Sequence, residues 1–219
     1  MSDIVKHICW AALLAVASLT GHPASADDII TEWTSVKVPA APELKSVTVE
    51  PKTTALLVLD MMKGNCGVRP RCGASVPTVK KLVDVARAHN MIIAHNLTGQ
   101  NPKIEDIVDQ SLAPRPGELL IANGRGADKF IDSTNLLQAL KDKGINTVIV
   151  TGTSAQGAVS GTSNGATQRG FKAVVPVDGM SSEDAFNELY AAWHLAKGGP
   201  AALVNNVTLT RSDMIKFGD

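Results

Sequence analysis

The sequence predicts an α/β fold built on a mainly parallel sheet with helices on both faces. Short, continuous apolar runs recur along the chain, and such runs are typical of strands that are buried on both faces. Segments with apolar residues at helical spacing lie between these runs. Because strand and helix alternate, neighbouring strands are expected to be joined by crossover connections and therefore to run parallel.

Residues 1–26 are predicted to be a secretory signal peptide. A basic start and the apolar run ICWAALLAVASLTG precede the A-x-A site Ala24-Ser25-Ala26. A run of roughly 7–15 apolar residues in that order is typical of a signal peptide, whereas a membrane-spanning helix needs about 20. We expect cleavage after Ala26 and a periplasmic or secreted protein. The alternative is an N-terminal core helix.

Residues 27–52 are predicted to form an extended arm, because they contain three prolines and show little periodicity. The domain follows over residues 53–219. Its expected strands are the apolar runs over residues 54–60, 91–95, 119–121, 147–150, 171–177 and 207–210, the last at an edge of the sheet.

Helices are expected over residues 77–90, 135–143, 156–168 and 182–196. Two of them are followed by Gly144 and Gly170, in the place where a glycine commonly ends a helix. The last helix has an acidic, capped start in the segment Ser181–Asp184.

The composition excludes several kinds of partner. The formal net charge is 0 at pH 7, and aromatic residues make up 4% of the chain. Neither a basic stripe nor a base-stacking surface for nucleic acid is therefore indicated. No polybasic amphipathic stretch suggests a membrane surface once the signal peptide is removed. The expected partner is a small-molecule substrate.

Cys66 and Cys72 remain after Cys9 leaves with the signal peptide. An exported compartment is oxidising, so this pair is a candidate disulfide. A short loop can strain such a bond. The alternative is a free, reactive thiol.

Asp60 is the first candidate catalytic residue. Ligands of open α/β sheets bind beyond the carboxyl ends of the strands, and Asp60 ends an otherwise apolar run. A carboxylate there loses solvation and must be paired, hydrogen-bonded or protonated. The position favours a general base with a tuned pKa. A carboxylate that caps the following loop is the alternative.

Four motifs resemble those of the isochorismatase-like hydrolases, a superfamily of cysteine hydrolases that includes the nicotinamidases. They are LLVLDMM, PRPGELLI, GINTVIVTGTSAQGAV and RGFKAVVPVDGMSS, and they cover most of residues 53–182. The resemblance implies a three-layer α/β/α sandwich and a homo-oligomer. It also implies an Asp–Lys–Cys triad that cleaves C–N bonds of small amides or, in some members, a vinyl ether.

Of that triad, only the aspartate is retained at the matched positions, as Asp60. Counting from the turn Pro116-Gly117-Glu118 places Asn123 where the lysine is expected. Ala158 stands where the family's cysteine opens a helix. Because alanine has no atom that can attack a carbonyl carbon, the usual thiol chemistry is not possible.

Three replacements for the missing groups are conceivable. Lys129 could take the place of the lysine, unless it is a surface lysine. Cys66 could supply a thiol, unless it is bound to Cys72. Water activated by Asp60 could attack a reactive substrate directly.

Hydroxyl groups near Ala158 do not obviously replace the thiol. Ser160 follows by two positions, about 200° around the helix, and should point away. Thr153 and Ser154 are more naturally residues that cap the helix.

Six residues are predicted to contact the substrate: His95, Asn123, Arg125, Ser154, Gly157 and Ala158. His95 is otherwise a satisfied core residue, and Arg125 either binds an anionic substrate through charge-assisted hydrogen bonds or lies in a solvated loop. His95 has no second metal ligand near it in the sequence, so neither a metal nor another cofactor is expected. His194 is expected to pack against the domain or lie at an interface.

Two functional hypotheses follow. The first is an exported isochorismatase-like hydrolase of a small amide, a related C–N compound or a vinyl ether, with a non-standard site built on Asp60 and Lys129. The second is a pseudoenzyme of the same fold that binds a small molecule without chemistry, and the departures at Asn123 and Ala158 support it.

Overall fold

The computed structural model describes residues 28–122, 126–131 and 135–218. The chain divides into two compact units, Met1–Val38 and Pro39–Asp219. The described part of the first unit contains one short helix, α1 (Ile29–Glu32), which Asp28 caps by accepting a hydrogen bond from the Thr31 N–H at 3.0 Å. The second unit carries the sheet and the candidate site.

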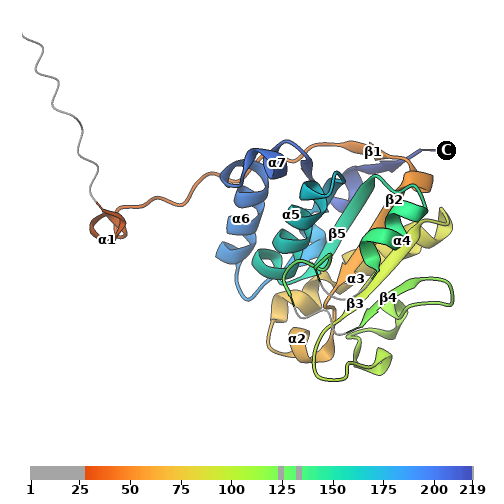
Figure 1. The fold of residues 1–219 in the computed structure, drawn as a ribbon. Helices are drawn as coiled ribbons and strands as arrows, with labels where there is room; N and C mark the ends of the chain where they lie inside the picture. Colours follow the sequence, from red (N-terminus) through yellow and green to blue (C-terminus); the bar gives the residue numbers. More distant parts are fainter. Residues whose placement is uncertain (1–27, 123–125, 132–134, 219) are drawn as a thin grey trace, which may run out of the picture. The chain divides into compact units, whose positions relative to one another are not determined.

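A parallel sheet forms the centre of the second unit (Figure 1). Its strands lie in the order β4-β3-β2-β5-β6-β8, and the short strand β7 also pairs with β5. The strands are β2 (Thr54–Leu59), β3 (Ile92–Leu97), β4 (Leu119–Ala122), β5 (Thr147–Thr153), β6 (Lys172–Pro176), β7 (Met180–Ser181) and β8 (Val207–Thr210). Every pairing in this sheet is parallel, as the alternating pattern of strands and helices predicts.

Helices connect these strands. They are α2 (Lys63–Gly67), α3 (Pro70–Ala88), α4 (Leu136–Asp142), α5 (Ser160–Gln168), α6 (Ala185–Trp193) and α7 (Ala201–Val204). A π-helical turn over Ala155–Val159 leads into α5, and another over His194–Gly198 follows α6. The predicted start of α3 at Pro77 is wrong, because its buried stripe already begins at Cys72 and Ser75 and continues past Pro77 to Val79.

Two hydrophobic clusters lie on opposite faces of the sheet. Leu57 and Leu59 of β2 belong to the cluster that contains buried residues of α4, α5, α6 and α7. The alternate residues Leu56 and Val58 belong to the cluster formed with α3. Because successive side chains of a strand point to opposite faces, β2 is covered on both sides. This confirms the predicted three-layer α/β/α sandwich.

A strand lies within the predicted arm. Strand β1 (Val47–Val49) pairs in parallel with β9 (Ile215–Phe217) in a separate two-stranded sheet. Before it, the Lys45 N–H donates to the Leu209 carbonyl at 2.9 Å. Val49 and Ile215 are buried in the cluster on the α3 side. The end of the predicted arm is therefore part of the domain, and its apolar alternation was too short to indicate a strand.

The order of the strands locates the site. The chain runs outward from β2 through β3 to β4, and then returns to place β5 on the other side of β2. In open α/β sheets, ligands bind beyond the carboxyl ends of the strands at such a switch point. Here those ends carry Asp60, which follows β2, and Ser154, which follows β5.

Candidate active site

Asp60 leaves the sheet in an unusual backbone conformation. Its φ is 55°, in the left-handed region that aspartate enters more readily than most residues. The Asp60 N–H donates to the Asn96 carbonyl at 3.2 Å, and the Asn65 side chain donates to the Asp60 carbonyl at 2.9 Å. These contacts hold the backbone on both sides of the residue and fix the direction of its carboxyl group.

The Asp60 carboxyl group forms a buried ion pair with Lys129. Its Oδ2 lies 3.2 Å from Lys129 Nζ, and the Lys129 side chain is only 1% exposed. Lys129 Nζ also donates to the Gly126 carbonyl at 2.7 Å, and the Asn96 side chain donates to Asp60 Oδ1. Lys129 is therefore not a surface lysine. Counting along the sequence had instead placed the expected lysine at Asn123.

Burial raises the pKa of the Asp60 carboxyl group above its ordinary range. The charge and hydrogen bond of Lys129, the hydrogen bond from Asn96 and the charge of Arg69 all lower this pKa, but burial has the larger effect. The pKa of Asp60 is thus closer to neutral pH than that of an exposed aspartic acid. A raised pKa suits a residue that both gives and takes a proton.

A cavity of about 260 Å³ opens over this pair. Its lining residues are Asp60, Asn65, Arg69, Thr98, Gly126, Ala127, Lys129, Thr153, Ser154, Gly157 and Ala158. The structure thus brings together the predicted residues Asp60, Lys129, Ser154, Gly157 and Ala158. Ala158 presents a methyl group where the family pattern places a thiol.

Neither hydroxyl at the start of this helix acts as the predicted cap. Ser154 stands at the N-cap position but makes no capping hydrogen bond with its side chain. The Thr153 hydroxyl instead donates to the Ser181 carbonyl at 3.2 Å. The Ser160 hydroxyl donates to the Ala155 carbonyl at 2.8 Å, within its own helix. Thr153 and Ser160 are thus engaged with the backbone, and of the three residues only Thr153 and Ser154 line the cavity.

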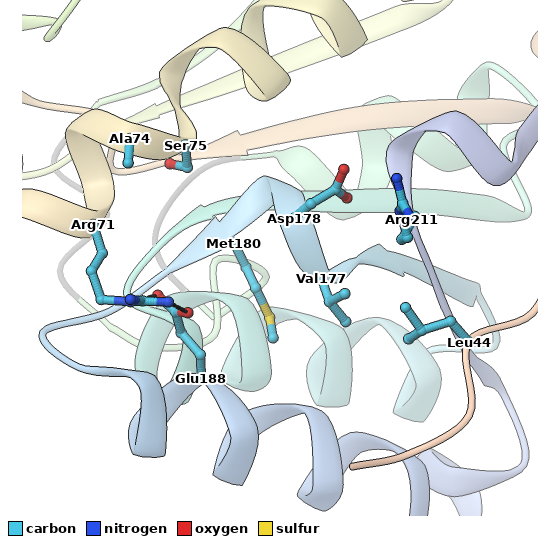
Figure 2. A pocket seen from close by; sticks show the side chains of 9 residues that line it. All are labelled: Leu44, Arg71, Ala74, Ser75, Val177, Asp178, Met180, Glu188 and Arg211. Carbon is cyan, nitrogen blue, oxygen red and sulfur yellow. Dashed lines mark hydrogen bonds and ion pairs between the residues drawn. The ribbon is translucent and has the colours of Figure 1, made fainter.

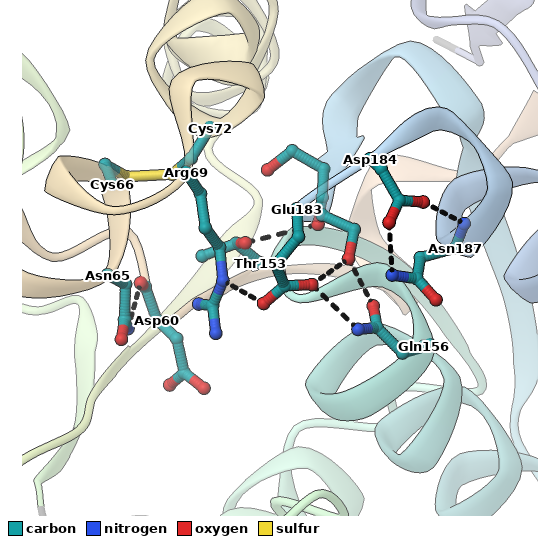
Figure 3. Close-up of polar contacts among 12 residues, drawn as sticks. Asp60, Asn65, Cys66, Arg69, Cys72, Thr153, Gln156, Glu183, Asp184 and Asn187 are labelled. Atoms are coloured by element: carbon teal, nitrogen blue, oxygen red, sulfur yellow. Dashed lines mark hydrogen bonds and ion pairs between the residues drawn. A yellow bond between two sulfur atoms is a disulfide. The ribbon is translucent and has the colours of Figure 1, made fainter.

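Arg69 is a lining residue that was not predicted. Figure 3 shows its guanidinium group between the carboxyl groups of Asp60 and Glu183. Arg69 Nε donates to Glu183 Oε1 at 2.6 Å. Hydrogen bonds from Ser182, Gln156 and Arg69 lower the pKa of Glu183 to about 2. The signal for Arg69 in the sequence was its place between the two cysteines of CGVRPRC.

A disulfide joins Cys66 at the end of α2 to Cys72 in the first turn of α3 (Figure 3). The loop that it closes contains Arg69 and Arg71. A disulfide-bonded Cys66 has no thiol to attack a substrate. The predicted disulfide is therefore formed, and Cys66 is not available as the alternative nucleophile.

His95 lies away from the cavity, in a buried cluster with Glu118 and Arg87. His95 Nε2 lies 2.8 Å from Glu118 Oε2, and Arg87 Nε donates to Glu118 Oε1 at 2.8 Å. Burial lowers the pKa of His95, although Glu118 opposes this effect, so the imidazole is neutral at pH 7. The structure thus places His95 as a core residue rather than as a donor to substrate.

Glu118 itself remains ionised. Burial alone would raise the pKa of Glu118, but hydrogen bonds from Arg87, from the Arg115 N–H and from His95 lower it to about 2.

Two other predicted contacts, Asn123 and Arg125, lie outside the described residues. His194 follows α6 and stacks on Tyr190 with ring centroids 5.9 Å apart.

A second and larger cavity, of about 370 Å³, lies elsewhere on this unit (Figure 2). Arg71 and Glu188 form an ion pair at one end, while Asp178 and Arg211 lie at the other. Asp178 accepts hydrogen bonds from both the N–H and the hydroxyl of Ser212. The charged groups that line this second cavity are thus bound to each other or to neighbouring loops.

The described part of the chain contains no cluster of three or more histidine, cysteine, aspartate or glutamate side chains that could hold a metal ion. Nor is any helix within the described ranges long and apolar enough to cross a membrane.

The parallel α/β/α sandwich is the fold of the isochorismatase-like hydrolases. The sequence model of the Isochorismatase domain matches residues 54–208, which include strands β2 to β7 and the start of β8. The chain belongs to the isochorismatase family.

Two relatives of this chain carry isochorismatase in their names. The secreted isochorismatase effector Isc1 of Verticillium dahliae is 30% identical over 120 residues, which cover 51% of this chain and 62% of the effector. The uncharacterized isochorismatase family protein YwoC of Bacillus subtilis is 25% identical over 159 residues, which cover 64% of this chain and 83% of that protein. The match to Isc1 thus spans less than two thirds of that relative's length.

Solved structures agree on the fold. The cysteine hydrolase from Pseudomonas syringae pv. phaseolicola has a TM-score of 0.66 at 16% identity, and the match covers 80% of this chain and 95% of that one. At this identity the likeness shows the fold alone.

Proposed function

We propose that the protein is an exported hydrolase of a small substrate, that Asp60 is its acid–base residue, and that a vinyl ether suits the site better than an amide or another C–N compound. One observation carries the proposal: the Asp60–Lys129 pair is complete, while Ala158 lines the same cavity without a nucleophile. Such a site favours a reaction that begins with the transfer of a proton to the substrate.

Amide hydrolysis fits this site less well. The carbonyl carbon must be attacked by a nucleophile before the amine leaves, and a thiol normally does this in the family. Loss of the nucleophile typically lowers the rate of such an enzyme by several orders of magnitude. Without a thiol at position 158, Asp60 would have to activate water for attack on the carbonyl carbon.

Hydrolysis of a vinyl ether needs no nucleophilic side chain. The Asp60 carboxylic acid gives its proton to the terminal alkene carbon, and the π electrons form the new C–H bond. The other carbon becomes an oxocarbenium ion, which water attacks while the Asp60 carboxylate takes a proton from that water. The resulting hemiketal breaks the C–O bond to its alkoxy group, the hydroxyl proton passes to the leaving oxygen, and the products are an alcohol and a ketone or aldehyde.

The surroundings of Asp60 support both halves of this cycle. Burial stabilises the neutral acid before proton transfer. Lys129 Nζ at 3.2 Å and the amide of Asn96 stabilise the carboxylate that remains afterwards. A general acid in this role typically contributes about 10²- to 10⁴-fold to the rate.

The test is turnover of a panel of small vinyl ethers, amides, ureas and esters by the purified exported protein. We expect hydrolysis of vinyl ethers, with kcat/KM lowered about 10²- to 10⁴-fold in Asp60→Asn. Asp213→Asn, the same exchange at an exposed ion pair with Arg211, should leave the rate unchanged. Equal turnover by wild type and Asp60→Asn would exclude Asp60 as the acid.

Export is part of the same proposal. The predicted signal peptide over residues 1–26 supports it, as does the name of the relative Isc1, which describes a secreted protein. Mass spectrometry of the chain produced in a bacterium with a periplasm should find Asp27 as the first residue. A periplasmic or secreted protein that still carries Met1 would contradict cleavage.

We also propose that the protein is a homo-oligomer. Light scattering of the purified exported protein tests this proposal.

A further inference from the structure

We infer that Arg69 forms an anion-binding subsite beside Asp60, so that the substrate carries a carboxylate or similar anionic group close to the bond that reacts. The inference rests on the proposed function only in taking the Asp60 cavity as the place where the substrate binds. It adds the chemical class of the substrate and names the residue that selects it.

The guanidinium group has donors available for such a ligand. An arginine carries five N–H donors in a planar fork, and the contact with Glu183 uses Nε. Within the described ranges, no hydrogen bond is recorded for the two terminal nitrogens of Arg69. These nitrogens form the edge that binds a carboxylate with two parallel hydrogen bonds.

The position of Arg69 is fixed from two sides. The disulfide between Cys66 and Cys72 closes the loop that carries Arg69, and the ion pair with Glu183 anchors Nε. The side chain of Arg69 is 21% exposed, so its charge is only partly screened by water. A guanidinium held in this way loses little freedom when an anion binds.

The other charged lining residues leave this role to Arg69. Three charged residues line the described cavity, namely Asp60, Lys129 and Arg69. Lys129 Nζ is already bound to Asp60 Oδ2 and to the Gly126 carbonyl. Lys129 is therefore paired with Asp60, a carboxylate of the lining. Arg69 is paired with Glu183, which is not part of the lining.

Arg71 provides a matched control from the same disulfide loop. Its Nε and Nη2 donate to the two carboxylate oxygens of Glu188, and it faces the second cavity (Figure 2). Replacing Arg71 removes the same charge from the same loop without touching the Asp60 cavity. A subsite effect should therefore appear at Arg69 and not at Arg71.

The experiment measures equilibrium binding of benzoate and benzamide, which share a ring and differ in charge, by calorimetry on the purified exported protein. Wild type should bind benzoate roughly 10- to 100-fold more tightly, as expected for a charge-assisted pair. Arg69→Gln should reduce this preference to less than about 3-fold, whereas Arg71→Gln should keep it.

Glu183→Gln separates recognition from a purely structural tether. It keeps Arg69 but weakens the contact at Nε, so the preference for benzoate should remain. A wild type without the preference, an Arg69→Gln protein that keeps it, or a Glu183→Gln protein that loses it as Arg69→Gln does would each overturn the inference. Because binding is measured without turnover, failure of the proposed chemistry would appear separately, in the Asp60→Asn comparison.

Discussion

At the scale of single residues, the proposed function depends on Asp60 and Ala158. Asp60 was predictable, because a carboxylate at the end of a buried strand is costly unless it is used or paired. The sequence has alanine at position 158, where the resemblance to the family led us to expect a cysteine. Lys129 was only one of several candidates, since a long-range ion pair leaves no periodic trace in the sequence.

Restoring the thiol tests whether the site is otherwise intact. We expect Ala158→Cys to react with iodoacetamide at pH 7 about 5- to 10-fold faster than an ordinary cysteine, because Lys129 and the helix start favour the thiolate. Mass spectrometry follows the alkylation. The control is Lys143→Cys, which places a thiol on an exposed helix end. A thiol at position 158 that reacts no faster than the control would show that the site does not activate a nucleophile.

At the scale of elements, β2 and β5 determine where the reactive groups lie. Leu59 is in register with Gly152, directly before Asp60 on one strand and before Thr153 on the other. Gly152 has a φ of 119°, and a Cβ atom there would overlap the Leu59 carbonyl oxygen. A glycine is thus required for β5 to approach β2 at the base of the site.

Gly152→Ala should therefore cost stability and activity together. We expect a loss of at least about 3 kcal/mol in the free energy of unfolding, from backbone strain and overlap with β2. The control is Gly73→Ala in α3, where nothing lies within 4 Å of the added atom and alanine favours a helix by about 0.5–1 kcal/mol. Urea unfolding measures both changes. Equal stability of Gly152→Ala and wild type would contradict the close approach.

The elements were the most predictable part of the structure. Buried runs such as 54–60 and 147–150 marked β2 and β5, because strands covered on both faces must be apolar throughout. Strand β1 and the first turns of α3 were missed. β1 has too few residues for alternation to be recognised, and the prolines of α3 obscured a helix that tertiary packing stabilises.

At the scale of the whole molecule, the buried cluster of Glu118, Arg87 and His95 couples stability to pH. Glu118 has a side chain only 12% exposed. Burial opposes its ionisation, but Arg87, the Arg115 N–H and His95 together lower its pKa from 4.5 to about 2. A carboxyl group with a lowered pKa stabilises the fold above its unfolded pKa. That stabilisation is lost as the pH falls from about 4.5 towards 2.

We therefore expect the free energy of unfolding of wild type to fall by on the order of 3 kcal/mol between pH 5 and pH 2 through protonation of Glu118 alone. Glu118→Gln should be less stable at pH 7 and should lose correspondingly less over the same range. Glu43→Gln, at an exposed position, is the matched exchange. Urea unfolding at several pH values measures the slopes. The same acid slope in Glu118→Gln and wild type would contradict the role of the cluster.

The central claim, that Asp60 donates a proton, is tested most directly by the pH dependence of kcat/KM for a vinyl ether substrate. Because burial raises the pKa of Asp60 and the protonated acid is the active form, kcat/KM should fall as the pH rises through that pKa. The charge of Arg69 lowers the same pKa, so the falling limb should move to higher pH in Arg69→Gln. A kcat/KM that rises with pH over this range, or a falling limb that persists in Asp60→Asn, would contradict the claim.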